Sequence, residues 1–82
     1  MVIFMCNSFP KRLKELRISK GLKQTDLAEI LDMSTRGYQY YESSSESSFR
    51  EPNFYNLTKI ADYFDVSVDY LLGRTDNPKI NN

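Results

Sequence analysis

The stretch QTDLAEILDMSTRGYQYYE, residues 24–42, decides the fold, because it predicts two short helices joined by a tight turn. The first helix has an apolar face, since four of its residues recur at helical spacing: Leu27, Ala28, Ile30 and Leu31. Ser34 suits the start of the second helix, because its hydroxyl can accept a hydrogen bond from an unpaired backbone N–H. Tyr38 and Tyr41 stand three residues apart on one face of that helix. We expect this face to be buried, with the tyrosine hydroxyls at its rim.

The other faces of the second helix carry side chains that can contact bases: Thr35, Arg36, Gln39 and Tyr40. A helix-turn-helix of this size places its second helix in the major groove of DNA. Arg36 can donate to O6 and N7 of guanine at the same time. The alternatives are that it contacts a phosphate or is a solvated surface side chain. Gln39 suits adenine or is an exposed polar residue, and Thr35 suits a thymine methyl group or a phosphate. Tyr40 can bond a phosphate, lie against a sugar, or pack on the helix surface.

One helix is predicted before this stretch and two after it, so the fold class is all-α. The first helix begins at Ser8 or Phe9 and ends at Gly21, which adopts the left-handed conformation easily. Its buried stripe is predicted to be Leu13, Leu16 and Ile18. Asn53 suits the start of a later helix, whose apolar positions are Leu57, Ile60, Ala61 and Phe64. Ser67 suits the start of a last helix over residues 68–72, closed by Gly73.

The chain is predicted to form one domain over residues 9–73, since 82 residues leave no room for a second. Residues 1–8 form an apolar extension that hangs free, packs on the core, or pairs as a strand edge. Residues 43–48 are a serine-rich loop, because such a polar run cannot build a core. Residues 74–82 are expected to be a flexible tail.

Charge is unevenly distributed along a chain whose net charge is zero. Between residues 10 and 23 there are six basic residues and one acid, whereas from residue 51 onwards there are three basic residues and five acids. This asymmetry suits a protein that shows one basic face to phosphate without binding polyanions in general. The alternative interpretation is a solvated helix face.

Composition argues against several classes of site. The chain has no histidine and one cysteine, so no metal site, disulfide or His-based catalytic centre is expected. The opening MVIFMC has no basic region before it and is too short for a signal peptide, and no apolar run is long enough for a membrane span. We therefore expect a cytoplasmic protein that is not an enzyme and needs no cofactor.

Three separated motifs resemble the Cro/repressor-type (XRE) helix-turn-helix family. RLKELRISKGLKQTDLAEIL, residues 12–31, is similar to the first two helices of that family. MSTRGYQYYE, residues 33–42, is similar to its recognition helix, and IADYFDVSVDYLLG, residues 60–73, to its closing signature. Three motifs in the right order are much more specific than a lone helix pair.

The resemblance implies a compact five-helix bundle of the lambda-repressor-like type that binds a palindromic operator in double-stranded DNA as a homodimer. Base contacts would come from Thr35, Arg36 and Tyr40, with Gln39 beside them. Backbone contacts would come from Lys23, Gln24, Ser43, Arg50 and Asn53. Arg17 and Glu42 match a pair that forms an ion pair between the first and third helices. The function implied is that of a repressor from a phage or mobile element, or else that of a small stand-alone bacterial regulator.

The sequence departs from the family pattern at three places. Asp32 stands where the turn often has glycine, and Asp tolerates the left-handed conformation at some cost. Lys23 replaces the frequent Ser or Thr helix cap, which forfeits about 1 kcal/mol of capping. The loop between residues 42 and 52 is longer than usual and lacks its glycine, which leaves Arg50 as its one basic residue.

The apolar cluster near the end of the chain exceeds what so short a segment can bury by itself. Its candidate dimer residues are Val68, Tyr70, Leu71 and Leu72. The alternative is an intramolecular patch covered by the N-terminal MVIFM. The alternative function is a protein-interaction module, such as an antitoxin or the partner of another regulator, with weak DNA binding. The near-neutral charge and the apolar termini favour that alternative somewhat.

Overall fold

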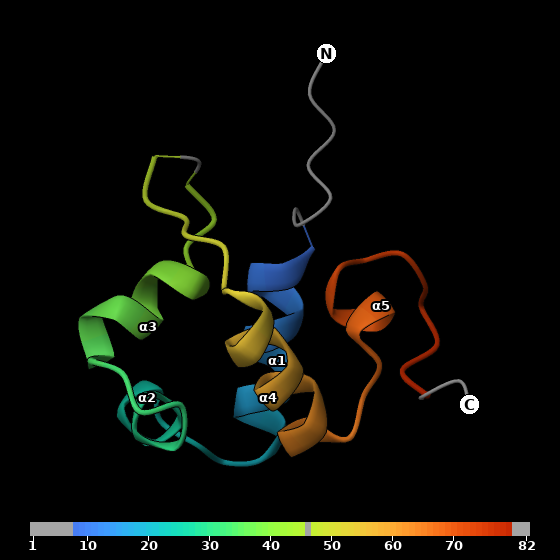
Figure 1. Ribbon diagram of the computed structural model, residues 1–82, viewed down its shortest axis with the longest axis horizontal. Helices are drawn as coiled ribbons and strands as arrows, with labels where there is room; N and C mark the ends of the chain where they lie inside the picture. The colour runs from blue at the N-terminus through green and yellow to red at the C-terminus, as the bar shows by residue number, and fades with distance from the viewer. Residues whose placement is uncertain (1–7, 46, 80–82) are drawn as a thin grey trace.

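The computed structural model describes residues 8–45 and 47–79, which form five helices and, within those ranges, no strand (Figure 1). The helices are α1 (Phe9–Ser19), α2 (Gln24–Ile30), α3 (Thr35–Tyr41), α4 (Phe54–Phe64) and α5 (Val68–Leu71). In Figure 1, α2 and α3 lie together at one end, α1 and α4 lie in the middle, and α5 lies at the opposite side. The predicted all-α fold with five helices is confirmed. The predictions for MVIFM lie outside the described residues.

Three helices begin at the polar residues that the sequence indicated. The side-chain oxygens of Ser34, Asn53 and Ser67 accept hydrogen bonds of 3.0, 2.8 and 3.0 Å from backbone N–H groups of α3, α4 and α5. Helix α2 lacks such a cap, because the ammonium of Lys23 cannot accept a hydrogen bond. Asp26 compensates in part, since its Oδ2 accepts from the Lys23 N–H at 2.8 Å. The loss of capping stability at α2 is therefore smaller than the presence of lysine in place of Ser or Thr at position 23 suggests.

The turns between helices use the left-handed conformation. Gly21 after α1 has a φ of 69°, and Asp32 between α2 and α3 has a φ of 57°. Both positions were predicted to adopt it. Asp65, between α4 and α5, shares the φ of 57°, which the sequence analysis did not anticipate. An aspartate can occupy this region because its short polar side chain bonds locally.

The core is built from one stripe of α1 packed against the other helices. Its buried apolar residues are Phe9, Leu13, Leu27, Ala28, Leu31, Tyr38, Tyr41, Ile60, Ala61, Phe64, Val66 and Leu71. The stripe of α1 runs through Phe9, Leu13 and Arg17, four residues apart, and the prediction that Ile18 belongs to it is wrong. Ile18 is 57% exposed. It lies nine residues after Phe9, about half a turn around the helix axis from it.

The described part of the C-terminal segment lies against α1 and the start of α5. Arg12 Nη1 donates to the carbonyl oxygens of Tyr70 and Thr75 at 2.5 and 2.6 Å, and Nη2 pairs with Asp76 Oδ1 at 2.6 Å. The Ser67 N–H donates to the Pro78 carbonyl oxygen at 2.9 Å. Flexibility of residues 74–82 stays a prediction, but residues up to 79 have defined partners in the fold.

Candidate nucleic-acid interface

An ion pair fixes the end of α3 to α1. Arg17 Nε lies 2.6 Å from Glu42 Oε2, and Arg17 Nη2 donates to Glu42 Oε1 at 3.1 Å. A third guanidinium nitrogen, Nη1, donates to the Leu22 carbonyl oxygen at 2.9 Å. The two-point contact fixes the relative orientation of the groups, as fork-to-carboxylate pairs do. The expected pair is thus present, and it ties the end of α3 to α1.

Glu42 collects two further donors. The Tyr38 hydroxyl donates to Oε2, and Gln24 Nε2 donates to Oε1 at 3.2 Å. Tyr38 is fully buried, so its hydroxyl is bound inside the protein instead of reaching the rim. The hydroxyl of Tyr41 accepts from Asn56 Nδ2 at 2.9 Å, which ties α3 to α4 as well. The inner face of α3 is therefore held by both packing and polar contacts.

These contacts shift the ionisation of the buried groups. Burial alone raises the pKa of Glu42, but the hydrogen bonds from Arg17, Tyr38 and Gln24 outweigh it and hold the pKa below its ordinary value. Burial, followed by the hydrogen bond to Glu42, raises the pKa of Tyr38 far above that of a free tyrosine. Glu42 is thus an anion and Tyr38 a neutral phenol throughout the physiological range.

The lowered pKa of Glu42 predicts an acid-sensitive fold. A carboxyl whose pKa is lower in the folded state contributes stability above its unfolded value, near 4.5, and loses it as pH falls through the folded value. The free energy of unfolding, measured in urea from pH 7 to pH 3, should fall more steeply for the natural protein than for Glu42→Gln. Glu29→Gln, on an exposed part of α2, is the matched control and should follow the natural protein. Parallel curves for the natural protein and Glu42→Gln would contradict the prediction.

The outer face of α3 presents the predicted base-contacting residues together. Arg36 and Gln39 are exposed, and Thr35 and Tyr40 are partly exposed. Gln39 Nε2 donates to Gln24 Oε1 at 3.2 Å. Because Gln24 also donates to Glu42, its amide connects an exposed side chain of α3 to the buried ion pair. Whether any of these side chains contacts DNA stays a prediction.

Tyr40 lies between two arginines. Arg36 Nε donates to its hydroxyl at 3.3 Å, and the Arg50 guanidinium carbon lies 5.1 Å from the centre of its ring. The Arg50 N–H also donates to the Tyr40 carbonyl oxygen at 3.2 Å. The loop after α3 is thereby fastened to the end of the helix.

Four of the five predicted backbone-contacting residues lie at the ends of α2, α3 and α4, and the fifth, Arg50, lies in the loop between α3 and α4. Lys23 is exposed at the start of α2, next to Gln24. Ser43 follows α3, and its Oγ accepts from the Ser45 N–H at 3.2 Å. Asn53 is exposed, and its side-chain Oδ1 accepts from the Asn56 N–H as the cap of α4.

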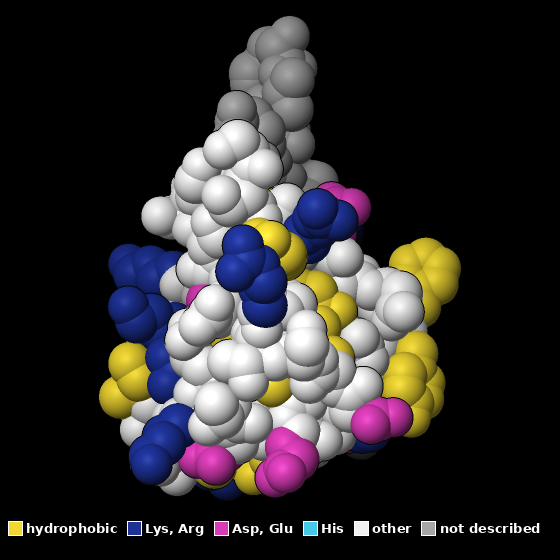
Figure 2. All heavy atoms as spheres, turned by 90° about the vertical axis from the view of Figure 1, so that its left-hand side faces the viewer, with side chains coloured by type: hydrophobic (Ala, Val, Ile, Leu, Met, Phe, Trp, Pro, Cys, Tyr) yellow, Lys and Arg dark blue, Asp and Glu magenta, His cyan; other side chains and the backbone are white. Residues whose placement is uncertain are grey.

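The charge distribution differs from the simple count of basic residues. Arg12 and Arg17 are engaged with Asp76 and Glu42, so four of the six basic side chains before α2 are exposed: Lys11, Lys14, Lys20 and Lys23. Figure 2 views the α2–α3 end of the molecule, where Lys and Arg side chains gather on one side and above the centre of the face. Asp and Glu side chains lie mostly along its lower margin. The face is basic in part, not uniformly.

The prediction that Leu71 lies in a dimer interface is wrong. Leu71 is 0% exposed and belongs to the core, so it has no surface to offer a partner. Val68, Tyr70 and Leu72 are partly exposed. The Tyr70 ring is covered by the Arg12 guanidinium, whose central carbon lies 4.2 Å from the ring centre.

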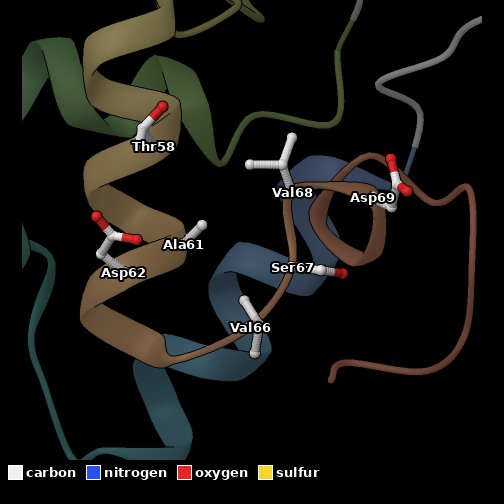
Figure 3. Close-up of a pocket in the computed structure, with 7 residues that line it drawn as sticks. All are labelled: Thr58, Ala61, Asp62, Val66, Ser67, Val68 and Asp69. Atoms are coloured by element: carbon white, nitrogen blue, oxygen red, sulfur yellow. The ribbon is translucent and has the colours of Figure 1, made fainter. Parts of the chain in front are cut away.

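Sequence reasoning missed the most exposed aromatic side chains of the described residues. Phe54 is 88% exposed and Tyr55 is 69% exposed, at the start of α4. A signal was available for Tyr55, which falls on the side of α4 opposite the apolar stripe of Leu57, Ile60, Ala61 and Phe64. Phe54 falls at the margin of that stripe, seven residues before Ala61, so spacing alone does not predict its exposure. A shallow groove of about 290 Å³ lies between α4 and the segment leading into α5 (Figure 3). Its lining residues are Thr58, Ala61, Asp62, Val66, Ser67, Val68 and Asp69.

Comparison with known proteins places these features in a family. A helix-turn-helix family model matches residues 13–71. Among relatives from Bacillus subtilis (strain 168), the chain is 36% identical over 74 residues to the HTH-type transcriptional regulator ImmR, covering 90% of this chain and 55% of ImmR. It is 38% identical over 72 residues to the uncharacterized HTH-type transcriptional regulator YqaE, covering 88% of this chain and 59% of YqaE.

A third relative is the SPbeta prophage-derived uncharacterized HTH-type transcriptional regulator YonR from the same organism. It is 39% identical to the chain over 67 residues, covering 82% of this chain and 58% of YonR. The chain thus spans less than two thirds of the length of these relatives. No solved structure matches the chain.

Proposed function

Because the chain belongs to the Cro/repressor-type (XRE) helix-turn-helix family, we propose that it is a sequence-specific DNA-binding transcriptional regulator. One observation carries the proposal. The inner face of α3 is fixed by Tyr38, Tyr41 and the Glu42 contacts, while its outer face presents polar side chains to solvent. A rigid helix with an unoccupied polar face suits insertion into the major groove.

The proposed mechanism is steric repression by a dimer. Each subunit inserts α3 into the major groove of one half-site, and the two half-sites lie about 34 Å apart on the same face of the duplex. Arg36 and Thr35 read base edges, with Gln39 and Tyr40 beside them, and Lys23, Gln24, Ser43, Arg50 and Asn53 hold the backbone. RNA polymerase is excluded where the operator overlaps a promoter. Such a regulator acts in the cytoplasm without a cofactor, and residues 9–73 are its DNA-binding unit.

The dimer surface that we propose is centred on the groove between α4 and α5. Phe54, Thr58 and Ala61 fall four and three residues apart, so Phe54 shares a face of α4 with two groove residues. A two-fold axis near Thr58 would place Phe54 of each subunit over the groove of the other, as a self-complementary interface requires. Val68 lines the groove, and Tyr70 and Leu72 follow its last lining residue, Asp69, in the sequence.

Selection of bound sites from a random double-stranded DNA library tests the function. We expect a palindromic consensus whose half-sites are one helical turn apart. Each subunit offers two cationic backbone contacts, Lys23 and Arg50, so the plot of log affinity against log salt should have a slope of about −3.6 for a dimer. Lys23→Gln should make that slope shallower by about two units, since two contacts are lost per dimer.

A control variant and the opposing outcome complete the test. Lys59→Gln removes a lysine of α4 that is not among the proposed backbone contacts, and it should leave the slope unchanged. An unenriched library would rule out sequence-specific binding.

The second candidate is a protein-interaction module, favoured by the exposed Phe54 and Tyr55 and by the zero net charge. Phosphate contacts would be few in that case, and the affinity for DNA would depend weakly on salt. The slope measured above therefore separates the two candidates.

A further inference from the structure

We infer that Tyr40 is a positioning residue, which holds the Arg36 guanidinium for base readout and couples it to Arg50 in the loop. The inference rests on the proposed function, since base readout presupposes DNA binding. It differs from a direct role for Tyr40 in reading bases. Three contacts carry it, and they join two elements: α3 and the loop after it.

The contact with Arg36 uses the helical spacing. Residues four apart lie above one another on a helix surface, which brings the Tyr40 hydroxyl beside the Arg36 side chain. The hydroxyl accepts from Nε at 3.3 Å. A guanidinium has five N–H donors, so this bond occupies the single Nε donor and leaves both Nη groups for a partner. Arg36 is then restricted to end-on approach to guanine, with Nη1 and Nη2 facing O6 and N7.

The contacts with Arg50 give Tyr40 a second task. The Arg50 guanidinium lies over the Tyr40 ring at 5.1 Å, and its backbone N–H closes on the Tyr40 carbonyl oxygen at 3.2 Å. That carbonyl is at the end of α3, where it also accepts from the Ser43 N–H at 3.4 Å, so the Arg50 N–H is its second backbone donor. The loop is therefore attached through both backbone and side chain. One tyrosine thus keeps two cations on the same face of the helix, one beside the base edges and one at the loop.

Recognition improves because the Arg36 side chain is already held in place in the free protein. A free arginine side chain loses rotamer freedom when it binds, and holding it beforehand lowers that cost. Tyr40 makes this contribution without touching a base. Its hydroxyl proton stays available for a phosphate oxygen, since the hydroxyl acts as the acceptor toward Arg36.

Tyr40→Phe separates the positioning role from a direct one, because it keeps the ring and removes the hydroxyl. The probe is the duplex selected by the natural protein, together with duplexes in which each base pair of the half-site is replaced in turn. Arg36→Ala should abolish the preference at one base pair. Tyr40→Phe should weaken the preference at that same base pair by roughly fivefold, the effect of one hydrogen bond. The double variant should discriminate no worse than Arg36→Ala.

A matched control is available on α4. Tyr55 is exposed and has Lys59 Nζ 5.5 Å from its ring centre, so Tyr55→Phe makes the same chemical change beside another cation. It should leave every base preference unchanged. If Tyr40→Phe alters a different base pair from Arg36→Ala, or adds to it independently, Tyr40 reads DNA itself and the inference is overturned.

A measurement without DNA keeps this inference distinct from the proposed function. In the NMR spectrum of the free protein, the Arg36 Nε–H signal should move on Tyr40→Phe and stay in place on Tyr55→Phe. An unmoved signal would overturn the positioning role even if the natural protein selects an operator. Failure to select any operator, with the signal moving as expected, would instead remove the proposed function while leaving the contact in place.

Discussion

Arg17→Met is expected to lower the free energy of unfolding by about 3 kcal/mol, because removing one partner of a buried ion pair leaves the other charge uncompensated. The Glu42 side chain is 4% exposed, so water cannot replace the guanidinium. Tyr38 and Gln24 still donate to the carboxylate, which keeps the loss from being larger. Equilibrium unfolding in urea measures the difference.

A double-mutant cycle identifies the cause of that loss. Glu42→Gln removes the charge but keeps an oxygen for the Tyr38 hydroxyl, so it is the matched partner of Arg17→Met. The double variant should lose less unfolding free energy than the two single variants lose together, with a coupling energy above about 1 kcal/mol. Coupling near zero would show that Arg17 acts through the packing of its carbon chain alone.

Phe9→Ala is expected to cost about 3–5 kcal/mol of stability, whereas Ile18→Ala should change it by less than about 0.5 kcal/mol. Phe9 is fully buried, with its ring centre 6.4 Å from that of Tyr41 and 6.3 Å from that of Phe49. Removing the ring leaves a cavity that the helices cannot close. Ile18 faces solvent on the other side of α1.

The two variants form a comparison within one helix, because each removes a large apolar side chain from α1. Thermal unfolding monitored by circular dichroism is sufficient to separate them. Similar losses for both variants would mean that Ile18 is buried in solution, and the position of α1 described above would be wrong.

Sequence signals with a local cause predicted the fold well. Ser34, Asn53 and Ser67 begin helices because a side-chain oxygen three residues before a backbone N–H is a local geometry. Gly21 and Asp32 adopt the left-handed conformation for equally local reasons. The ion pair between Arg17 and Glu42 was anticipated through family resemblance, not from spacing.

The errors concern burial, which depends on distant parts of the chain. Ile18 and Leu71 are equally apolar, yet only the second meets other helices. The exposure of Phe54 is invisible in a list of apolar residues, since the partner that would cover it is not a neighbour in sequence.

The polar contacts of the candidate site were also beyond sequence reasoning. Gln24 lies 18 residues from Glu42 and 15 from Gln39, and it bonds both through opposite ends of one amide. No spacing rule predicts such a chain, because it forms only when α2 and α3 have already packed. Arg50 over Tyr40 is a similar case, since the loop must fold back before the two can meet.

The Ser34 cap has a consequence for which side chains α3 presents to solvent. Successive residues of a helix are rotated by about 100° around its axis, so the residue at which α3 begins sets the rotational phase of all that follow. With the helix starting at Thr35, Tyr38 points into the core and Arg36 and Gln39 point out. A start displaced by one residue would turn the outward face by more than a quarter of a circle. The hydroxyl of Ser34 therefore helps to determine which side chains of α3 face the core and which face solvent.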